Sequence, residues 1–230
     1  MKYLLAFNFL FLFLAFAALV FHNFNKTNDF KWNQKLEIIV STSEGIYRGY
    51  SVQSLQWRKN NFYLKGLESD TWKLHIKGEA PFVELPDGRV VVAALDGDEY
   101  NGIGSFLIEK TNGITYNRHT NLETYLSNVV LSSPQTYTIH RDSYLDPKII
   151  IFENNHDPNF FTLLPPKVVA NSTHSDIQII VQITRTDDAL TALKLPTIFS
   201  WFAEFDAWDT LSVKAGSVTL SINYQDFVRN

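Results

Sequence analysis

Apolar and polar residues alternate along much of the chain after residue 35, and this period of two limits the possible folds more than any other feature. Side chains of a β-strand point alternately to its two faces, so the pattern predicts strands with one buried and one exposed face. Leu36, Ile38 and Val40 alternate with Glu37, for example. Strands are expected within residues 36–40, 46–57, 72–77, 82–85, 89–95, 104–109, 148–152, 177–183 and 218–224.

Two turn motifs are expected to join neighbouring strands into hairpins. Ser43-Glu44-Gly45 separates the first two strands, and Pro86-Asp87-Gly88 separates the fourth and fifth. In the second motif, proline fixes φ at the first turn position and glycine suits the left-handed one. The pattern favours a mainly β fold, an antiparallel β-sandwich or a partly open barrel with one or two short helices.

Two segments have helical spacing instead. One covers residues 122–130, with Thr120 or Asn121 as the N-cap. The second is expected from residue 197 to about residue 210, after Pro196, and carries several acidic residues that disfavour an anionic membrane. Its apolar face either packs on the sheet or docks on a partner. That possible docking face consists of Ile198, Trp201, Phe202, Phe205 and Trp208.

Residues 3–21 form an apolar run in which Asn8 is the only strongly polar residue. At about 1.5 Å per residue, such a run is long enough for a helix to cross the hydrocarbon core. Ala15-Phe16-Ala17 offers a signal peptidase pattern, so residues 1–21 are either a transmembrane anchor or a cleaved signal peptide. The anchor is favoured because the run continues past Ala17 and exceeds the usual apolar length of a signal peptide.

Residues 22–34 are expected to be a polar tether between the span and one β-rich globular domain over residues 35–230. Lys2 precedes the span and Lys26, Lys31 and Lys35 follow it, so the positive-inside rule does not favour export of the domain. A short N-terminal tail before one apolar run is nevertheless the layout of an export signal. The domain is therefore predicted to be exported and to lie close to the membrane surface.

The composition excludes several functional classes. The chain has no cysteine, which rules out disulfides, a thiol nucleophile, cysteine zinc sites and iron–sulfur clusters. Its 20 basic and 24 acidic residues give a net charge of -4, without the basic excess that phosphate neutralisation requires. No nucleic acid and no cofactor is therefore expected.

The sequence also has few candidates for catalytic or metal-binding residues. Asp96-Gly97-Asp98-Glu99 gathers three carboxylates, but Tyr100 and Asn101 stand where a Ca²⁺ loop needs an oxygen ligand and a glycine, so a solvated turn is favoured. The histidines form no HExxH, HxH or HxxxH pair, although His140 with Asp142, or His156 with Asp157, stays open as part of a site built from distant loops. GxSxG, GxxxxGK[ST] and GxGxxG are absent. No catalytic, cofactor-binding or metal-binding residue is assigned.

Several short motifs occur together along nearly the whole chain. They are Gln34-Lys35-Leu36, Gly45 and Gly49 before Ser51-Val52, Gly78-Glu79-Ala80, Leu85 with Gly88-Arg89, Asp157-Pro158, Ile183-Thr184 with Asp187, Leu195-Pro196, and Asp226-Phe227-Val228-Arg229. This set resembles a family of uncharacterised bacterial proteins that have one N-terminal hydrophobic segment and a domain of about this length. The chain departs from them in its Asn-, Phe- and Lys-rich composition and in its aromatic run near Trp201. The resemblance implies this layout and no activity or cofactor.

Together these observations predict a single-pass protein of the bacterial inner membrane, with a periplasmic domain that is a non-catalytic binding or structural module. It would bind another envelope protein or an envelope component, and cleavage near Ala17 would instead release it into the periplasm. Two alternatives remain. One is an exported hydrolase acting on a glycan or ester through Asp96, Asp98, Glu99 or Asp142, and the other is a small-ligand carrier.

Overall fold

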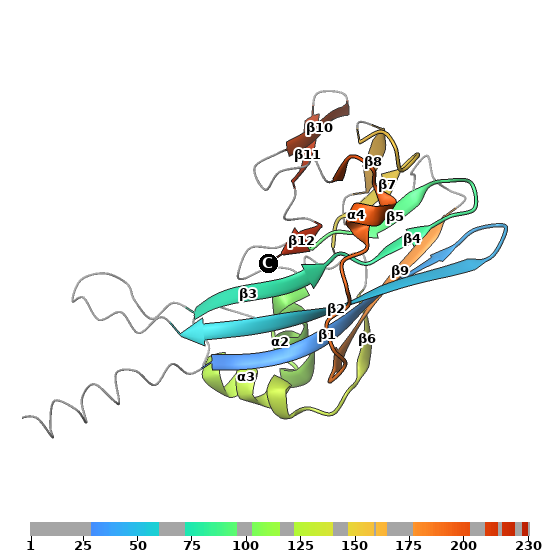
Figure 1. Cartoon of the computed structure of the whole chain (residues 1–230). Helices are drawn as coiled ribbons and strands as arrows, with labels where there is room; N and C mark the ends of the chain where they lie inside the picture. Colours follow the sequence, from blue (N-terminus) through green and yellow to red (C-terminus); the bar gives the residue numbers. More distant parts are fainter. Residues whose placement is uncertain are drawn as a thin grey trace, which may run out of the picture.

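The computed structural model describes residues 29–59, 72–95, 103–115, 122–139, 147–158, 160–164, 177–202, 210–215, 218–223 and 227–229. These residues form a mainly β structure with a six-stranded sheet, a four-stranded sheet, a two-stranded sheet and few short helices (Figure 1). All paired strands run antiparallel. The two larger antiparallel sheets are consistent with a sandwich.

The six-stranded sheet has the order β12-β3-β2-β1-β9-β6, and the four-stranded sheet has the order β4-β5-β7-β8. The strands of the first sheet are β1 (Asp29–Ser41), β2 (Ile46–Lys59), β3 (Trp72–Glu79), β6 (Thr136–Ile139), β9 (Gln178–Thr186) and β12 (Val228–Arg229). Those of the second are β4 (Phe82–Glu84), β5 (Val90–Ala93), β7 (Ile149–Phe152) and β8 (Phe161–Leu164). The two-stranded sheet consists of β10 (Thr210–Ala215) and β11 (Val218–Asn223).

The long hairpin of β1 and β2 is the centre of the larger sheet. The Thr42 N–H donates to the Gly45 carbonyl at 2.9 Å, which closes the turn predicted at Ser43-Glu44-Gly45. The alternation also holds, because Leu36 and Ile38 are fully buried. Strand β1 begins at Asp29, so residues 29–34, which were expected in the tether, form part of the sheet.

The inner face of this sheet is covered at one end by two helices, α2 (Ile103–Asn112) and α3 (Leu122–Leu131). A Cβ atom at Gly104 would collide with the Leu74 side chain, so the missing side chain lets α2 lie directly against β3. Phe106 of α2 also meets Tyr137 of β6 edge to face, with ring centroids 6.4 Å apart. Helix α3 confirms the helix predicted over residues 122–130.

The strand predicted over residues 104–109 is wrong, because these residues lie in helix α2. Ile103 to Glu109 are all buried, so the run has neither a two-residue nor a 3.6-residue alternation, and periodicity cannot distinguish a buried strand from a buried helix. Gly113 ends the helix with a φ of 62°, which glycine adopts without strain. Asn112 also donates to the carbonyls of Ile108 and Tyr125, which joins α2 to α3.

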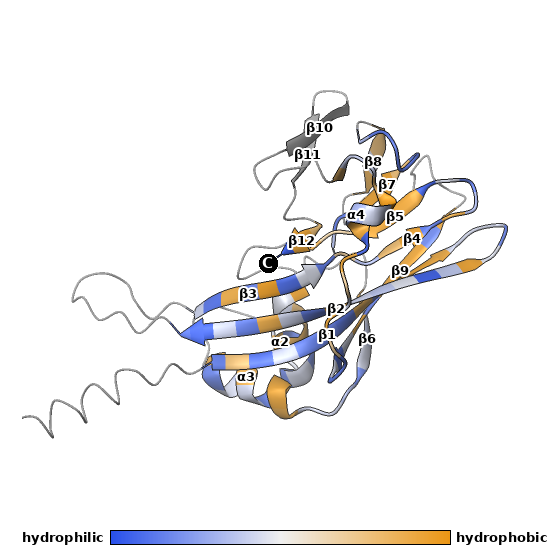
Figure 2. Cartoon of the chain, viewed as in Figure 1, coloured by the Kyte–Doolittle hydropathy of each residue, from blue (hydrophilic) through white to orange (hydrophobic). Residues whose placement is uncertain are grey.

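The four-stranded sheet covers the other end of the inner face. Its strands β5 and β7 are buried along their whole length, and Figure 2 shows them as continuous hydrophobic segments. The predicted turn at Pro86-Asp87-Gly88 connects β4 to β5, and Gly88 has the expected positive φ, at 89°. The Arg89 Nε donates to an Asp87 carboxylate oxygen at 2.7 Å, and this hydrogen bond lowers the pKa of Asp87.

The helix expected from residue 197 to about residue 210 is wrong over residues 199–202 and at Thr210, while residues 203–209 lie outside the described part of the chain. Helix α4 covers only Leu195–Ile198, Phe199 is extended, and Thr210 begins strand β10. Tertiary packing explains the difference: the Phe199 ring lies 4.8 Å from Phe152 and 4.9 Å from Trp201, inside an aromatic cluster that a continuous helix would disperse. Aromatic contacts with the four-stranded sheet therefore outweigh the local helical pattern.

A polar belt crosses the inner face midway along the hairpin. Gln34 and Gln53 are opposite one another on β1 and β2, are fully buried, and share a hydrogen bond of 3.2 Å. The Gln53 amide also donates to the Ser51 hydroxyl and to the Glu79 carbonyl. The belt lies between the strand positions covered by the helices and those covered by the four-stranded sheet.

None of the described helices is long and apolar enough to cross a membrane, and residues 3–21 lie outside the described part of the chain.

Candidate functional site

Strand β2 is paired differently on its two edges. Strand β1 pairs with it from Ile46 to Arg58, whereas β3 pairs with it only from Ser54 to Lys59. Along the first half of β2, the edge away from β1 therefore has no neighbouring strand among the residues that the structure describes. We call this part of β2, residues 46–51, the open edge.

The backbone groups of the open edge point alternately towards and away from β1. Beyond the open edge, the Val52 N–H donates to the Thr191 hydroxyl at 3.2 Å, and its carbonyl accepts from the Thr191 N–H at 3.4 Å. Both groups of Val52 thus point away from β1, and the two-residue period gives Arg48 and Tyr50 the same direction. Within the described residues, no hydrogen bond occupies the outward backbone groups of Arg48 and Tyr50.

Strand β4 presents a second edge to the same region. Its backbone bonds to β5 through Pro81, whose carbonyl accepts from Ala93 at 3.0 Å, and through Leu85, whose N–H donates to Arg89 at 2.8 Å. The alternation of an antiparallel pair then directs the backbone groups of Phe82 and Glu84 away from β5. Two strand edges from different sheets therefore border one space.

This space is an open groove with a volume of about 560 Å³. Gly49 marks the point of closest approach, because a Cβ atom there would collide with the Phe82 carbonyl oxygen. Only glycine lets β4 pass this close to β2. The groove is lined by Ile46, Tyr47, Arg48, Gly49 and Tyr50 of β2, by Phe82, Val83 and Glu84 of β4, and by Lys194, Thr197 and Ile198 at α4.

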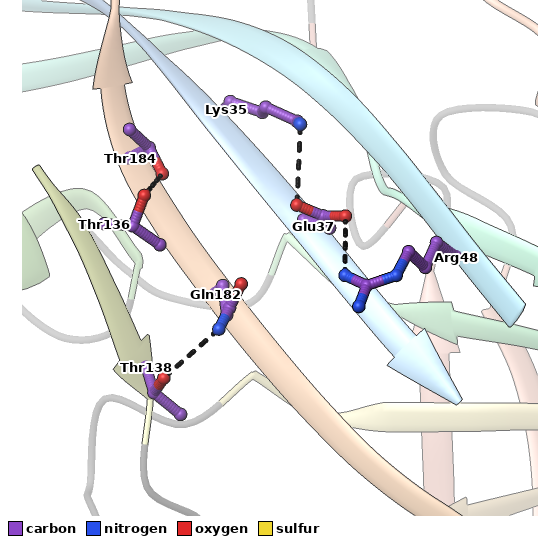
Figure 3. A network of polar contacts seen from close by, with 7 residues as sticks. All are labelled: Lys35, Glu37, Arg48, Thr136, Thr138, Gln182 and Thr184. Atoms are coloured by element: carbon purple, nitrogen blue, oxygen red, sulfur yellow. Dashed lines mark hydrogen bonds and ion pairs between the residues drawn. The ribbon is translucent and has the colours of Figure 1, made fainter. Parts of the chain in front are cut away.

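Charged and aromatic side chains beside the groove are held by their neighbours on the outer face of the sheet. Figure 3 shows Glu37 between Lys35 and Arg48, with both ion-pair distances at 3.4 Å. The Lys35 ammonium group also lies 4.5 Å from the centre of the Tyr50 ring. These contacts orient Arg48 and Tyr50, whose side chains remain more than half exposed. On β9 and β6, the same face has a hydrogen bond between the Thr136 and Thr184 hydroxyl groups and another from Gln182 to Thr138 (Figure 3), with the exposed Ile180 beside them.

A buried carboxylate fixes the α4 side of the groove. Glu79, at the end of β3, is 2% exposed and accepts hydrogen bonds from the backbone N–H groups of Lys194 at 2.7 Å and Leu195 at 3.0 Å. Burial raises the pKa of Glu79, while the two backbone hydrogen bonds and the Lys194 charge oppose this shift. The carboxylate stands at the beginning of α4, where the helix dipole also favours a negative charge.

The predicted docking face is divided by the structure. Phe202 is buried, and Ile198 and Trp201 are partly buried and pack against the core, as expected if the aromatic run packs on the sheet. Phe205 and Trp208 lie outside the described residues. Only Ile198 lines the groove. Docking of a partner on this face stays a prediction.

Most of the residues considered for chemistry also lie outside the described part: Asp96, Asp98 and Glu99 with their neighbours, and His140 with Asp142. His156 and Asp157 are described, in the loop between β7 and β8, where their N–H groups donate to the Asn154 side chain. Across the described ranges, no group of three or more histidine and acidic side chains is placed to hold a metal ion.

The groove was not predicted from the sequence, although one signal for it was present. Gly49 interrupts an otherwise alternating strand, which is typical of a close backbone approach. Compared with models of known protein families, with curated proteins and with solved structures, the chain finds no match.

Proposed function

We propose that this protein is a membrane-anchored, non-catalytic binding module that holds an extended polypeptide segment in the groove between β2 and β4. The observation that carries the proposal is the pair of open strand edges that border the groove. An added strand could pair with the backbone of Arg48 and Tyr50 and so extend the six-stranded sheet. Such pairing supplies affinity through main-chain hydrogen bonds and tolerates varied sequences.

The side chains beside the open edge suit this mode of binding. Tyr50 and Ile46, which are 58% and 66% exposed, flank Arg48 on the outer face and offer apolar contacts to alternate residues of an added strand. Arg48, Lys194 and Glu84 supply charges of both signs around the groove. A bound segment with alternating apolar residues and an acidic residue opposite Arg48 fits best.

The composition of the groove disfavours the two alternatives. Glu84 is the one carboxylate among its lining residues, whereas glycoside hydrolysis needs two carboxyl groups across the substrate. An open groove with charged walls also differs from the enclosed apolar cavity expected of a carrier for small apolar ligands.

The proposal includes the location of the protein. Residues 3–21 would span the bacterial inner membrane as a helix, and the domain, folded as a sandwich, would stand in the periplasm beside it. Membership of the family of uncharacterised single-span bacterial proteins belongs to the same proposal. A protease-protection assay on spheroplasts, combined with the intact mass of the product, tests this part. Digestion of the domain from outside at a mass that retains Met1 is expected, and full protection would contradict it.

Selection of peptides from a random ten-residue display library, against the full chain in detergent, tests the binding function. The decisive comparison is between Arg48→Pro and Arg48→Ala, because both remove the guanidinium group but only proline removes the outward N–H. Arg48→Pro is expected to weaken binding of the selected peptides about fivefold relative to Arg48→Ala, which corresponds to one main-chain hydrogen bond of about 1 kcal/mol at the open edge.

N-methylation of the peptides provides the complementary control. Two versions of each peptide are compared, one methylated on its odd-numbered nitrogens and one on its even-numbered nitrogens. One version is expected to lose binding and the other to bind almost normally, because only one edge of the peptide pairs with β2. Equal binding by the proline and alanine variants, or equal tolerance of methylation in both registers, would contradict strand addition.

A further inference from the structure

The end of the large sheet opposite the groove carries an exposed basic patch. The register places Lys31, Gln56 and His75 in one cross-strand row. The flanking rows contain Arg58 with Lys73, and Ser54 with Lys77. Directly opposed residues share a face, so these side chains lie on the same outer face of β1, β2 and β3. The basic patch consists of Lys31, Arg58, Lys73, His75 and Lys77, all of them exposed.

Among the described residues, little negative charge offsets this patch. Asp29 pairs with Arg58 at 3.5 Å and accepts a hydrogen bond from Gln56 at 3.1 Å. The side chains of Lys31, Lys73 and Lys77 form no ion pair with any residue that the structure describes. At the groove end, by contrast, Glu37 lies between the two cations. The patch therefore concentrates positive charge on a chain whose net charge is -4.

The position of the patch in the chain indicates its ligand. Strand β1 starts at Asp29, inside the patch, and only residues 22–28 separate it from the apolar run at residues 3–21. Seven residues reach at most about 25 Å, so a span at residues 3–21 would hold this end of the sheet near the headgroups. Phosphate groups of anionic lipids are complementary in charge to the exposed lysines.

We propose that the basic patch binds anionic phospholipid headgroups and orients the domain on the membrane. The inference rests on the proposed anchor and adds a second, electrostatic contact to it. Ten residues along β2 separate Arg58 in the patch from Arg48 at the groove, which is a distance of about 30 Å. Docking of the patch at one end of β2 would leave the groove at the opposite end of the strand, where an extended segment can enter it.

Because the chain has no cysteine, a single introduced thiol can report this orientation. The full chain carrying His75→Cys is labelled with a fluorophore and incorporated into nanodiscs that contain a headgroup quencher, with either about 30% phosphatidylglycerol or phosphatidylcholine alone. A matched label at Thr138→Cys reports the distant end of the same outer face. Quenching at position 75 is expected to be at least about twofold stronger in anionic discs and to fall in about 0.5 M NaCl, with little change at position 138.

Two charge variants separate the patch from net charge. Lys73→Gln with Lys77→Gln is expected to remove the effect of anionic lipid, and Lys110→Gln with Lys148→Gln, which changes net charge equally on other surfaces, is expected to retain it. Equal quenching in both kinds of disc, or equal loss in both double variants, would overturn the proposal. If the chain fails to co-purify with discs, the anchor is wrong, and binding to added anionic vesicles then tests the patch alone. The patch variant should bind these vesicles about 30-fold more weakly, and unchanged binding would overturn the proposal there too.

Discussion

The two ends of β2 share the partner strand β1 but differ in what lies at the second edge and on the inner face. At the Lys59 end, β3 pairs with the second edge and helices cover the inner face. The backbone groups are therefore hydrogen-bonded, and the apolar side chains are buried. At the Ile46 end, the second edge is open and a strand from another sheet crosses it at Gly49. The difference arises where β3 stops, at Glu79, and it shows how one continuous strand can be structural at one end and available for binding at the other.

The largest effect is expected from truncation at the paired end. Leu55 is fully buried between its cross-strand neighbours Trp32 and Ile76, so Leu55→Ala should lower the free energy of unfolding by about 2–5 kcal/mol. The exposed neighbour His75→Ala should change it by less than about 0.5 kcal/mol. Urea denaturation measures both, and a similar loss for the two variants would contradict the difference in burial.

A smaller but sharper effect is expected at the crossing of the two sheets. Gly49→Ala places a methyl group against the Phe82 carbonyl, and because backbone cannot move as a side chain can, the cost should be about 3 kcal/mol. Tyr50→Ala, one residue away on the exposed face, serves as the control in the same denaturation experiment. A neutral Gly49→Ala would show that β4 does not approach β2 this closely.

Glu79 is expected to make stability depend on pH. Burial raises its pKa in the folded state above 4.5, so the folded protein binds the proton more tightly than the unfolded chain does. Its contribution is therefore complete below pH 4.5 and is lost as the pH rises through the raised pKa. Glu79→Gln should flatten this part of the stability profile, and an identical profile in both proteins would contradict the assignment.

Removing the same side chain altogether tests its hydrogen bonds. Glu79→Ala leaves the N–H groups of Lys194 and Leu195 without their acceptor and should cost about 2 kcal/mol. Faster amide exchange at these two residues is the expected local sign. Unchanged exchange there would mean that α4 does not depend on Glu79.

The contact of Thr191 with Val52 should have a modest effect. Thr191→Val keeps the shape of the side chain but removes the hydroxyl that accepts from the Val52 N–H, at a cost of about 1 kcal/mol. The N–H of residue 191 still donates to the Val52 carbonyl, so the open edge itself is unchanged and peptide binding should persist. Loss of peptide binding with unchanged stability would place Thr191 in the binding site instead.

The smallest effect concerns the exposed charges beside the groove. Glu37→Gln removes the partner of Lys35 and Arg48 and should change stability by less than about 1 kcal/mol, with the difference vanishing in high salt. A salt-independent loss of several kcal/mol would contradict a solvent-screened pair.

The sequence was informative where local rules decide the structure. The β1–β2 hairpin, the Pro86-Asp87-Gly88 turn and helix α3 follow from periodicity and turn chemistry. Strands β6, β8 and β12 were missed because neither a turn motif, as between the equally short β4 and β5, nor an uninterrupted apolar run, as in β7, marks them in the sequence. Helix α2 and the end of α4 depended on burial and on aromatic contacts between distant segments, which no local window contains.

The groove was beyond sequence reasoning for a related reason. Its walls come from β2, β4 and α4, and residues 46 and 198 meet there although about 150 positions separate them. The open edge also depends on the residue at which pairing with β3 ends. Only the register of β3 against β2 gives this residue.

Amide hydrogen exchange along β2 of the free, full-length protein is the most direct test of the open edge, and it requires no ligand. Tyr47 and Gly49 direct their N–H groups towards β1, whereas Arg48 and Tyr50 direct theirs outward. Slow exchange at residues 47 and 49 that alternates with fast exchange at residues 48 and 50 is the expected result. Uniform protection across all four amides would show that the edge is already occupied and would contradict the proposed binding site.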